Sequence, residues 1–169
     1  MAQMPRLVLI SLLAPIAVAG EATRVAARDV LRLRLELPAV TIELAHLERD
    51  APPIHSLLGL VYEGTDDIPA AFDEWLSWWL QDDDWDPAGW FTARADGELA
   101  GVALCWKTGF VKDLAVHPAY RRRGIGRALL LHVIEEYRRR AVSTIELKVD
   151  ARNDAALALY ESLGMRIAK

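Results

Sequence analysis

The chain has 169 residues, a length that fits one domain of about 100 to 200 residues and argues against a two-domain enzyme. Apolar residues make up 53% and charged residues 26% of the sequence, so the chain can form a hydrophobic core and is not of the intrinsically disordered class. Its net charge of −4 argues against a nucleic-acid-binding protein, because such proteins use a basic surface to neutralise phosphates.

The first twenty residues admit two interpretations. One Arg, a mostly apolar run and then Ala17-Val18-Ala19 are typical of a cleavable secretory signal, and the run is too short to predict a membrane-spanning helix. The other interpretation is a retained, buried strand over Arg6–Leu12, which is rich in aliphatic and β-branched residues. We favour the retained strand and expect no association with a membrane.

The next segments show helical and alternating patterns. A helix is predicted over Glu21–Asp29, and a strand is predicted over Val30–Leu37, where apolar and charged residues alternate. A further strand is predicted over Val40–Leu47. We therefore divide the chain into an N-terminal extension, residues 1–39, and a domain formed by residues 40–169.

Two helices are expected to begin at prolines, since proline is favoured in the first turn of a helix. One begins at Pro52-Pro53 and runs to about Tyr62, and the other begins at Pro69 and runs to about Leu80. The remaining patterns predict strands over Trp90–Arg94, Leu99–Lys107, Phe110–Val116 and Ser143–Asp150, and helices over Gly126–Arg140 and Ala155–Leu163. Because strands and helices are mixed, the predicted class is α/β (α+β) with a central sheet.

Cysteine and histidine usage gives no sign of a metal site. The single Cys105 cannot form an intrachain disulfide or a cysteine-based zinc site, and it is predicted to be a buried strand residue. The four His residues form no pair with the spacing of metal ligands. We therefore predict no metal.

A glycine and arginine segment joins a predicted strand to a predicted helix. Gly124 and Gly126 allow a tight turn in which successive N–H groups converge, and the helix N-terminus adds unpaired N–H donors and a positive dipole end. Long-range positive charge comes from four arginines. This combination predicts a phosphate cradle formed by Arg121, Arg122, Arg123, Gly124, Ile125, Gly126, Arg127 and Ala128.

A second motif follows about thirty residues later. Asn153 precedes the last predicted helix, and Tyr160 lies seven residues further on, so both project from the same side of that helix. With these two motifs the segment from Trp90 to Met165 resembles the GNAT superfamily of acyl-CoA-dependent N-acetyltransferases. The resemblance implies a mixed, mostly antiparallel central sheet flanked by helices.

The resemblance also implies the roles of the motif residues. The loop over Arg121–Ala128 would bind the pyrophosphate of acetyl-CoA, the co-substrate. The preceding strand residues Leu114, Ala115 and Val116 would pair with the pantetheine arm. Asn153 would form a hydrogen bond to the same arm, cap the last predicted helix, or do both. Tyr160 would donate a proton to the departing thiolate, and a strand N–H near Ala115 would stabilise the oxyanion.

The general base is less well defined by the sequence. Asp113 lies on the strand beside the expected reaction centre and is our candidate. The alternative interpretation is that the Asp113 side chain faces solvent and has no catalytic role. Glu63, His117 and the acidic run Asp82–Asp86 are weaker candidates. Trp75, Trp78 and Trp79 recur at helical spacing, which predicts a core face, and the alternative is a wall of the acceptor pocket.

Charge is unevenly distributed along the chain. Residues 50–93 contain ten acidic residues and no Lys or Arg, whereas the other 125 residues carry 20 basic and 14 acidic ones. The basic surface is expected to meet the cofactor phosphates, and the acidic tract is expected to attract a cationic amine. We expect a small-molecule amine acceptor, because no extended peptide groove is recognisable, and a cytoplasmic location, where acetyl-CoA is supplied.

The chain departs from the family pattern at both ends. It has about 39 additional residues before Val40–Leu47, and it ends four residues after Met165, where the family usually continues with a β-hairpin. We hypothesise that Arg6–Leu12 and Val30–Leu37 supply the strands of that hairpin, from the same chain or across a homodimer. Alternative functions are an acyl-CoA-binding regulatory or assembly module without transferase activity and, with less support, a secreted binding protein.

Overall fold

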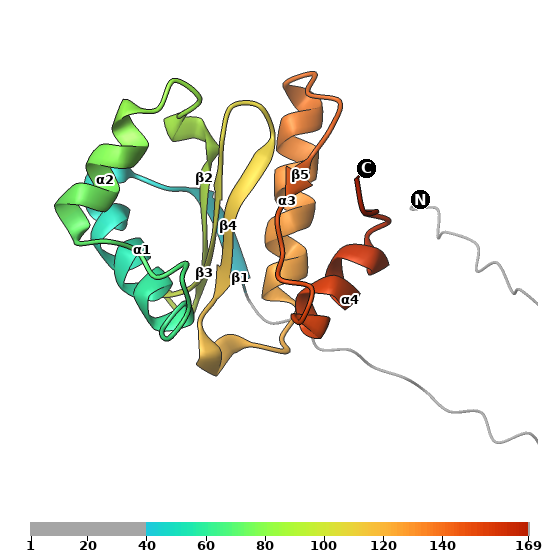
Figure 1. Cartoon of the computed structure of the whole chain (residues 1–169), viewed down its shortest axis with the longest axis horizontal. Coiled ribbons are helices and arrows are strands. Elements are labelled where there is room, and N and C mark those ends of the chain that lie inside the picture. Colours follow the sequence, from blue (N-terminus) through green and yellow to red (C-terminus); the bar gives the residue numbers. More distant parts are fainter. Residues whose placement is uncertain (1–39, 169) are drawn as a thin grey trace, which may run out of the picture. The chain divides into compact units, whose positions relative to one another are not determined.

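The computed structural model describes residues 40–168, which form a five-stranded sheet with helices on both faces (Figure 1). The strands lie in the order in which they occur in the sequence, and all neighbours are antiparallel except β4 and β5, which are parallel. This confirms the mixed, mostly antiparallel sheet expected from the sequence. The strands are β1 (Val40–Leu44), β2 (Trp90–Ala95), β3 (Glu98–Cys105), β4 (Phe110–Val116) and β5 (Glu146–Leu147).

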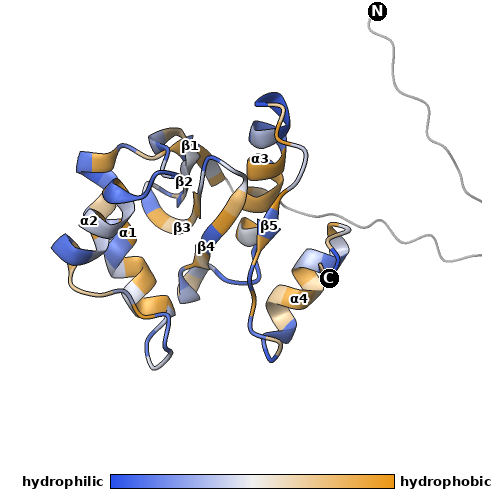
Figure 2. Cartoon of the chain, turned by 45° about the horizontal axis from the view of Figure 1, so that its top comes forward, coloured by the Kyte–Doolittle hydropathy of each residue, from blue (hydrophilic) through white to orange (hydrophobic). Residues whose placement is uncertain are grey.

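Two helices cover each face of the sheet. α1 (Leu47–Val61) and α2 (Phe72–Gln81) lie on one face, and α3 (Ile125–Arg139) and α4 (Asp154–Ser162) lie on the other (Figure 1). Short 3₁₀ turns over Pro87–Gly89 and Pro118–Tyr120 precede β2 and follow β4. In Figure 2, hydrophobic segments of β4 and α3 lie side by side, and these two elements contact each other.

Alternation along the strands divides the interior into two cores. On the α1/α2 face, Trp90, Val102 and Leu104 pack with the buried Trp75 and Trp79 of α2. On the opposite face, neighbouring strand residues pack against α3, with Leu129, Leu130, Val133 and Tyr137 fully buried among Phe91, Ala93, Ala103 and Cys105. Successive side chains of a strand point to opposite faces, so each strand contributes to both cores. Cys105 is buried, as predicted.

A β-bulge in β4 changes which residues share a face. Leu104 of β3 pairs with Asp113, but the next residue, Cys105, pairs with Val111, so Lys112 is an extra residue on β4. In a regular strand Val111 and Asp113 would point to the same side. With the bulge, Val111 packs in the α3 core, whereas Asp113 reaches the α1/α2 side.

Several predicted element boundaries were wrong. The strand predicted over Val40–Leu47 ends at Leu44, and α1 begins at Leu47 rather than at Pro52-Pro53, both of which lie inside the helix with exposed rings. The strand predicted over Ser143–Asp150 pairs with β4 only at Glu146–Leu147, although its side chains alternate as expected. The elements predicted before Val40, and with them the replacement hairpin, lie outside the described residues.

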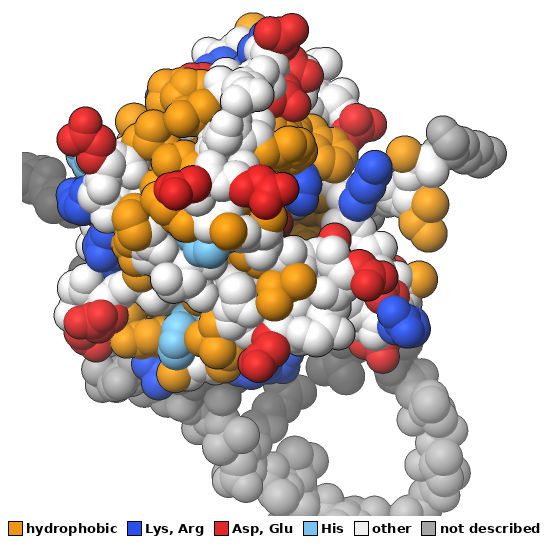
Figure 3. Space-filling view, turned by 60° about the vertical axis from the view of Figure 1, so that its left-hand side comes forward, with side chains coloured by type: hydrophobic (Ala, Val, Ile, Leu, Met, Phe, Trp, Pro, Cys, Tyr) orange, Lys and Arg blue, Asp and Glu red, His pale blue; other side chains and the backbone are white. Residues whose placement is uncertain are grey.

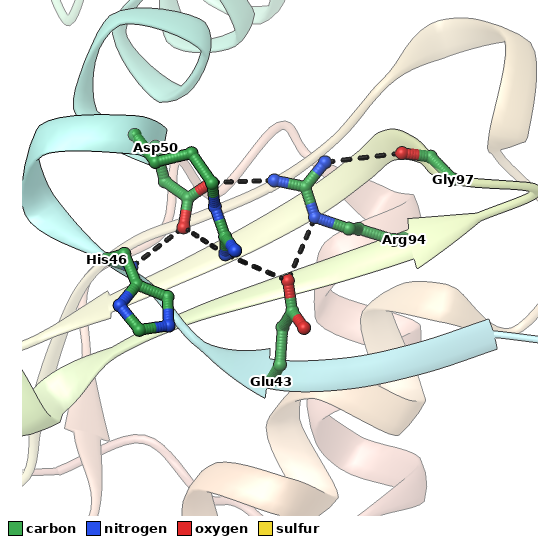
Figure 4. A network of polar contacts seen from close by, with 6 residues as sticks. Glu43, His46, Asp50, Arg94 and Gly97 are labelled. Carbon is green, nitrogen blue, oxygen red and sulfur yellow. Dashed lines mark hydrogen bonds and ion pairs between the residues drawn. The ribbon is translucent and has the colours of Figure 1, made fainter.

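A buried carboxylate fixes the early start of α1 (Figure 4). Asp50 has no exposed surface, and its Oδ2 accepts a 2.7 Å hydrogen bond from the His46 N–H, which caps the helix. Its Oδ1 lies 2.6 Å from Nη2 of Arg94 on β2, and Arg94 Nε is 3.0 Å from Glu43 on β1. Burial opposes ionisation of Asp50, but hydrogen bonds from the Arg49 side chain and the His46 N–H and the charges of Arg49 and Arg94 lower its pKa. The network joins α1 to the β1–β2 edge.

Candidate active site

The segment between β4 and α3 adopts the tight turn that its glycines permit. Gly124 caps α3 with φ of 80°, and Arg122 also has a positive φ, 63°. Both residues lie in the left-handed region, which is readily accessible to Gly and costly for most other residues. The turn places the N-terminus of α3 directly after the end of β4, because only the 3₁₀ turn Pro118–Tyr120 intervenes.

This turn presents free hydrogen-bond donors and positive charge. Within the described residues, the backbone N–H groups of residues 122–127 donate to no protein acceptor, and the first N–H that is bonded is that of Ala128, to Gly124 at 2.9 Å. Four exposed arginines surround these donors, and none of them forms an ion pair with a described acid: Arg121, Arg122, Arg123 and Arg127. Convergent N–H groups and unpaired cations at a helix N-terminus suit a phosphate or pyrophosphate.

Helix α4 completes this side of the site. A Cβ on Gly126 would stand 3.5 Å from Leu159 of α4 and 3.5 Å from Val116 of β4, so these three elements meet at the first turn of α3. Asn153 caps α4 by accepting a 3.1 Å hydrogen bond from the Ala156 N–H, which leaves its amide N–H₂ group available to a ligand. Tyr160 is half-buried against the α3 core, and burial raises the pKa of its hydroxyl.

The second edge of β4 is open over most of its length. β5 pairs with β4 only at Phe110 and Val111, so no described strand covers residues 112–116 on that side. The His117 N–H donates to Ala100 of the β3 side at 2.9 Å, and antiparallel pairing alternates the direction of N–H groups along a strand. The N–H and C=O groups of Leu114 and Val116 therefore face the open edge, whereas those of Ala115 face β3.

A cleft of about 350 Å³ opens on the α1/α2 side of the sheet, beside Asp113. Its walls combine aromatic rings with acidic side chains, a lining that suits a cationic amine. Figure 3 shows this side of the molecule, where hydrophobic and acidic side chains lie among one another. The side chains that matter most for its chemistry are Tyr62, Asp66, Asp67, Glu74, Trp75, Trp78, Trp79, Lys112 and Asp113.

Asp113 is the buried acid of this cleft. Its exposed fraction is 7%, and burial raises the pKa of its carboxyl group, an effect that Lys112 and the half-buried Tyr62 hydroxyl oppose. Burial and the neighbouring Asp113 charge raise the pKa of Tyr62. Asp113 of β4 and Tyr62, the residue after α1, thus meet in the cleft, while Tyr160 of α4 packs on the α3 side of the sheet. A carboxylate with a raised pKa is a suitable proton acceptor at neutral pH.

The structure separates the weaker sequence candidates from this centre. Nδ1 of His117 accepts the Ala119 N–H at 3.2 Å and so shapes the turn after β4, and Glu63 is exposed and does not line the cleft. The run Asp82–Asp86 does not line it either: Asp84 is paired with Lys107, and Asp86 is paired with Arg140 at the far end of α3. The attraction of a cationic acceptor by this acidic run stays a prediction.

Two of the three α2 tryptophans form part of the core, as predicted, and the interpretation that the three wall an acceptor pocket stays a prediction. Trp75 and Trp79 are buried in the core, while Trp78 is 50% exposed, and all three line the cleft. Sequence reasoning missed Tyr62, because a lone Tyr at the end of a helix carries no motif. It also missed the face that Asp113 occupies, because the bulge at Lys112 has no signal in a single sequence. The acidic tract was the only hint, since Asp66, Asp67 and Glu74 belong to it.

Comparison with known proteins agrees with this geometry. Residues 45–165 match the family model described as Acetyltransferase (GNAT) family. The chain belongs to the GNAT family. The family expected from the two motifs is therefore confirmed.

Relatives in the family act on different acceptors, as their names state. The chain is 45% identical over 84 residues to the ribosomal protein bS18-alanine N-acetyltransferase of Escherichia coli K12, a match that spans 46% of this chain and 55% of that protein. It is 37% identical over 105 residues to the mycothiol acetyltransferase of Thermobispora bispora, over 52% of this chain and 36% of that one. The matched segment thus spans about half or less of these curated relatives.

The fold agrees with that of a solved relative as well. The crystal structure of the ribosomal-protein-S18-alanine N-acetyltransferase from Escherichia coli superposes with a TM-score of 0.61 at 31% identity, and the match covers 77% of this chain and 79% of that chain. Among residues 40–168, no helix is long and apolar enough to cross a membrane. The same residues contain no group of three or more His, Cys, Asp or Glu side chains placed to hold a metal ion.

Proposed function

We propose that this protein transfers the acetyl group of acetyl-CoA to a primary amine by direct attack within a ternary complex, in the cytoplasm where this donor is supplied. The observation that carries the proposal is the open edge of β4. At one end this edge adjoins the cradle, whose N–H groups and arginines have no partner among residues 40–168, and at the other it adjoins the acidic, aromatic cleft. A donor and an acceptor bound in these two places would meet at Asp113 and Leu114.

The cradle and β4 are assigned to acetyl-CoA. The N–H groups of Arg122 to Arg127 would hold its pyrophosphate, and the guanidinium groups around them would add charge-assisted contacts. Leu114 and Val116 would pair with the pantetheine arm, and the amide of Asn153 would add a hydrogen bond to it. Because the Leu114 N–H faces the open edge, it is our candidate for the oxyanion donor that was expected near Ala115, a contribution of about 3–4 kcal/mol.

Asp113 and Tyr160 are assigned to proton transfer. Asp113 would accept the proton that an incoming ammonium group must lose before it can attack, a role that suits a buried carboxylate with a raised pKa. Tyr160 would donate its proton to the thiolate when the C–S bond breaks. A tyrosine hydroxyl is protonated at neutral pH, and burial raises the pKa of Tyr160 further, so the proton is present when the sulfur leaves.

Our first candidate for the acceptor is the α-amine of a polypeptide. The relative of 45% identity is named for acetylation of an alanine of ribosomal protein bS18, which favours a protein N-terminus over the small molecule expected from the sequence. The acids of the cleft, Asp66, Asp67 and Glu74, would attract the ammonium group, and Trp78 would contact it through its ring face. A small-molecule acceptor is the second candidate, favoured by the match to mycothiol acetyltransferases.

The test is release of the free thiol of coenzyme A by the full chain. Acetyl-CoA would be supplied with Ala-initiated peptides, the same peptides with a blocked α-amine, and a panel of polyamines, aminoglycosides and amino sugars. Thiol release that requires the free α-amine supports the first candidate, and release only with small amines supports the second. Saturable binding of acetyl-CoA without thiol release across the panel would instead favour an acyl-CoA-binding module.

A further inference from the structure

The cleft already contains a primary amine of the chain itself. Lys112, the residue that the β4 bulge adds, lines the cleft with its side chain 38% exposed. Its Nζ lies 3.8 Å from Oδ1 of Asp113 and 5.9 Å from the ring centroid of Trp78. A carboxylate and an aromatic face are the two groups that bind an ammonium ion most readily in proteins. Lys112 thus occupies the place that we assign to the acceptor.

The same amine lies within reach of the proposed reaction centre. Lys112 and Leu114 are two residues apart on β4, and a strand rises about 3.3–3.4 Å per residue, so their backbones are about 7 Å apart. The four methylene groups of a lysine side chain can span this distance. The Leu114 N–H faces the open edge, where the thioester carbonyl would lie, and Asp113 stands between the two residues. An amine, a base and an oxyanion donor are therefore consecutive on one strand.

We infer that Lys112 is a site of self-acetylation within one molecule, an inference that rests on the proposed acetyl transfer. The ammonium group of Lys112 first gives a proton to Asp113, which passes it to solvent. The neutral Nζ then attacks the thioester carbonyl carbon, so a C–N bond forms and the C–S bond breaks. Tyr160 protonates the departing thiolate, and the second proton lost by Nζ restores the Tyr160 hydroxyl. The products are Nε-acetyl-lysine and the free thiol.

Acetylation of Lys112 would change the cleft in two ways. The positive charge facing Asp113 would disappear, which leaves the buried carboxylate without its cationic neighbour. The added acetyl group would also occupy space beside Trp78, where we expect the acceptor to bind. The modified protein would therefore differ from the unmodified one at the acceptor side, while the arginine cradle on the other face of the sheet would be unchanged.

The chain offers a matched control in Lys107, which lies in the β3–β4 turn. Its side chain is 53% exposed, more than that of Lys112, and its Nζ is 3.5 Å from Asp84 outside the cleft. Both lysines thus have one carboxylate neighbour, but only Lys112 lies beside the candidate catalytic residues. Purely chemical acetylation by acetyl-CoA should modify the more exposed Lys107 at least as fast as Lys112.

The experiment incubates the full chain with acetyl-CoA and no acceptor, and maps acetyl-lysine by mass spectrometry over time. We expect Lys112 to be acetylated at least about 100-fold faster than Lys107, the lower end of what general acid–base catalysis contributes. The rate constant should not depend on protein concentration. Tyr160→Phe should slow acetylation of Lys112 and leave that of Lys107 unchanged, and Lys112→Arg should remove the fast phase altogether.

Other outcomes overturn the inference. Equal modification of the two lysines, or an unchanged rate at Lys112 in Tyr160→Phe, would show chemical acetylation. A rate constant that rises with protein concentration would show transfer between molecules. Absence of acetyl-Lys112 while an external amine still supports thiol release would refute self-acetylation and leave the proposed function standing. Absence of both, with acetyl-CoA bound, would refute the proposed function as well.

Discussion

The two faces of the sheet differ in charge and in how their functional groups are held. The α3/α4 face presents exposed cations without described acidic partners and N–H groups without protein acceptors, all within residues 121–127. The α1/α2 face presents acids and aromatic rings around a cleft, drawn from α1, the α1–α2 connection, α2 and β4. The first arrangement suits a polyanion and the second suits a cation. Under the proposed function, the two ligands would approach β4 from opposite faces of the sheet.

β4 borders both the cleft and the cradle. Its edge beyond Val111, which no described strand covers, leads from Asp113 beside the cleft to Val116 beside the cradle, and our proposal places the Tyr160 hydroxyl of α4 at the same edge. Substitutions confined to one face should therefore change the affinity for one ligand only. Substitutions at the shared centre should lower turnover without changing the binding of either ligand. The following predictions test this division.

Tyr160→Phe should have the largest effect, because it acts at the shared centre. Loss of the proton donor to the thiolate should lower kcat by about 10²–10⁴-fold while the affinity for acetyl-CoA stays within about twofold. Steady-state kinetics and equilibrium binding of acetyl-CoA would measure the two quantities. An unchanged kcat would remove Tyr160 from the proposed mechanism, and a matching loss of affinity would make it a binding residue.

Asp50→Asn should destabilise the fold and leave the cradle intact. Removal of one partner of a buried ion pair costs roughly 3–5 kcal/mol, and we expect about 3 kcal/mol here because Arg49 remains largely solvated. The folded-state pKa of Asp50 is lowered, so its contribution is present above the unfolded pKa, about 3.9, and is lost as the pH falls through the folded value. The difference between the two proteins should therefore shrink in acid.

Denaturant unfolding at several pH values would measure this effect, with Glu135→Gln as the control. Glu135 pairs with Arg138 on the exposed side of α3, and its loss should change the free energy of unfolding by less than about 1 kcal/mol. Equal effects of the two substitutions at neutral pH would contradict the structural role of the Asp50 network.

Asp113→Asn should lower kcat by about 10²-fold, as expected for loss of a general base, while acetyl-CoA affinity is retained. Burial raises the folded-state pKa of Asp113, so its charged form opposes folding: the protein is most stable below the unfolded pKa and loses this stability as the pH rises through the folded value. The variant should therefore unfold at higher denaturant concentration at neutral pH. Lower activity together with lower stability would argue that Asp113 is structural.

Gly126→Ala should act on the cofactor face alone. The added Cβ would meet Leu159 and Val116 only at ordinary contact distance, so the fold should tolerate it. It would stand where the pyrophosphate approaches, and loss of one charge-assisted hydrogen bond, about 1.5–3 kcal/mol, corresponds to roughly 10- to 100-fold weaker binding of acetyl-CoA. Calorimetric titration with acetyl-CoA would measure the change in affinity.

The control for Gly126→Ala is Gly59→Ala, in the last turn of α1. No atom lies within 4 Å of the Cβ that this change would add. It should stabilise the fold by about 0.5–1 kcal/mol, because glycine is unfavourable inside a helix, and it should leave the affinity for acetyl-CoA unchanged. Weaker acetyl-CoA binding in both variants would show that the effect at residue 126 is not local.

The difference between the two faces also explains which parts of the fold and of the candidate site could be predicted from the sequence. The cradle is a contiguous segment whose chemistry lies in local turn geometry, so Gly124, Gly126 and the arginines could be predicted, as could the strands and helices around them. The cleft depends on tertiary contacts between distant segments, and no local pattern places Tyr62 beside Asp113. The early start of α1 at Leu47 likewise depends on Arg94 of β2, which donates to Asp50 and is itself held by Glu43 of β1.

Because of the bulge in β4, Lys112 has no partner residue on β3. Leu104 and Cys105 are consecutive on β3, and their partners Asp113 and Val111 would be consecutive on β4 if Lys112 were deleted. Such a deletion would leave a regular ladder with every neighbour on its present face. A single-residue insertion or deletion at this position would therefore add or remove the amine without repacking either core. We expect related sequences to differ by one residue at this point of the strand.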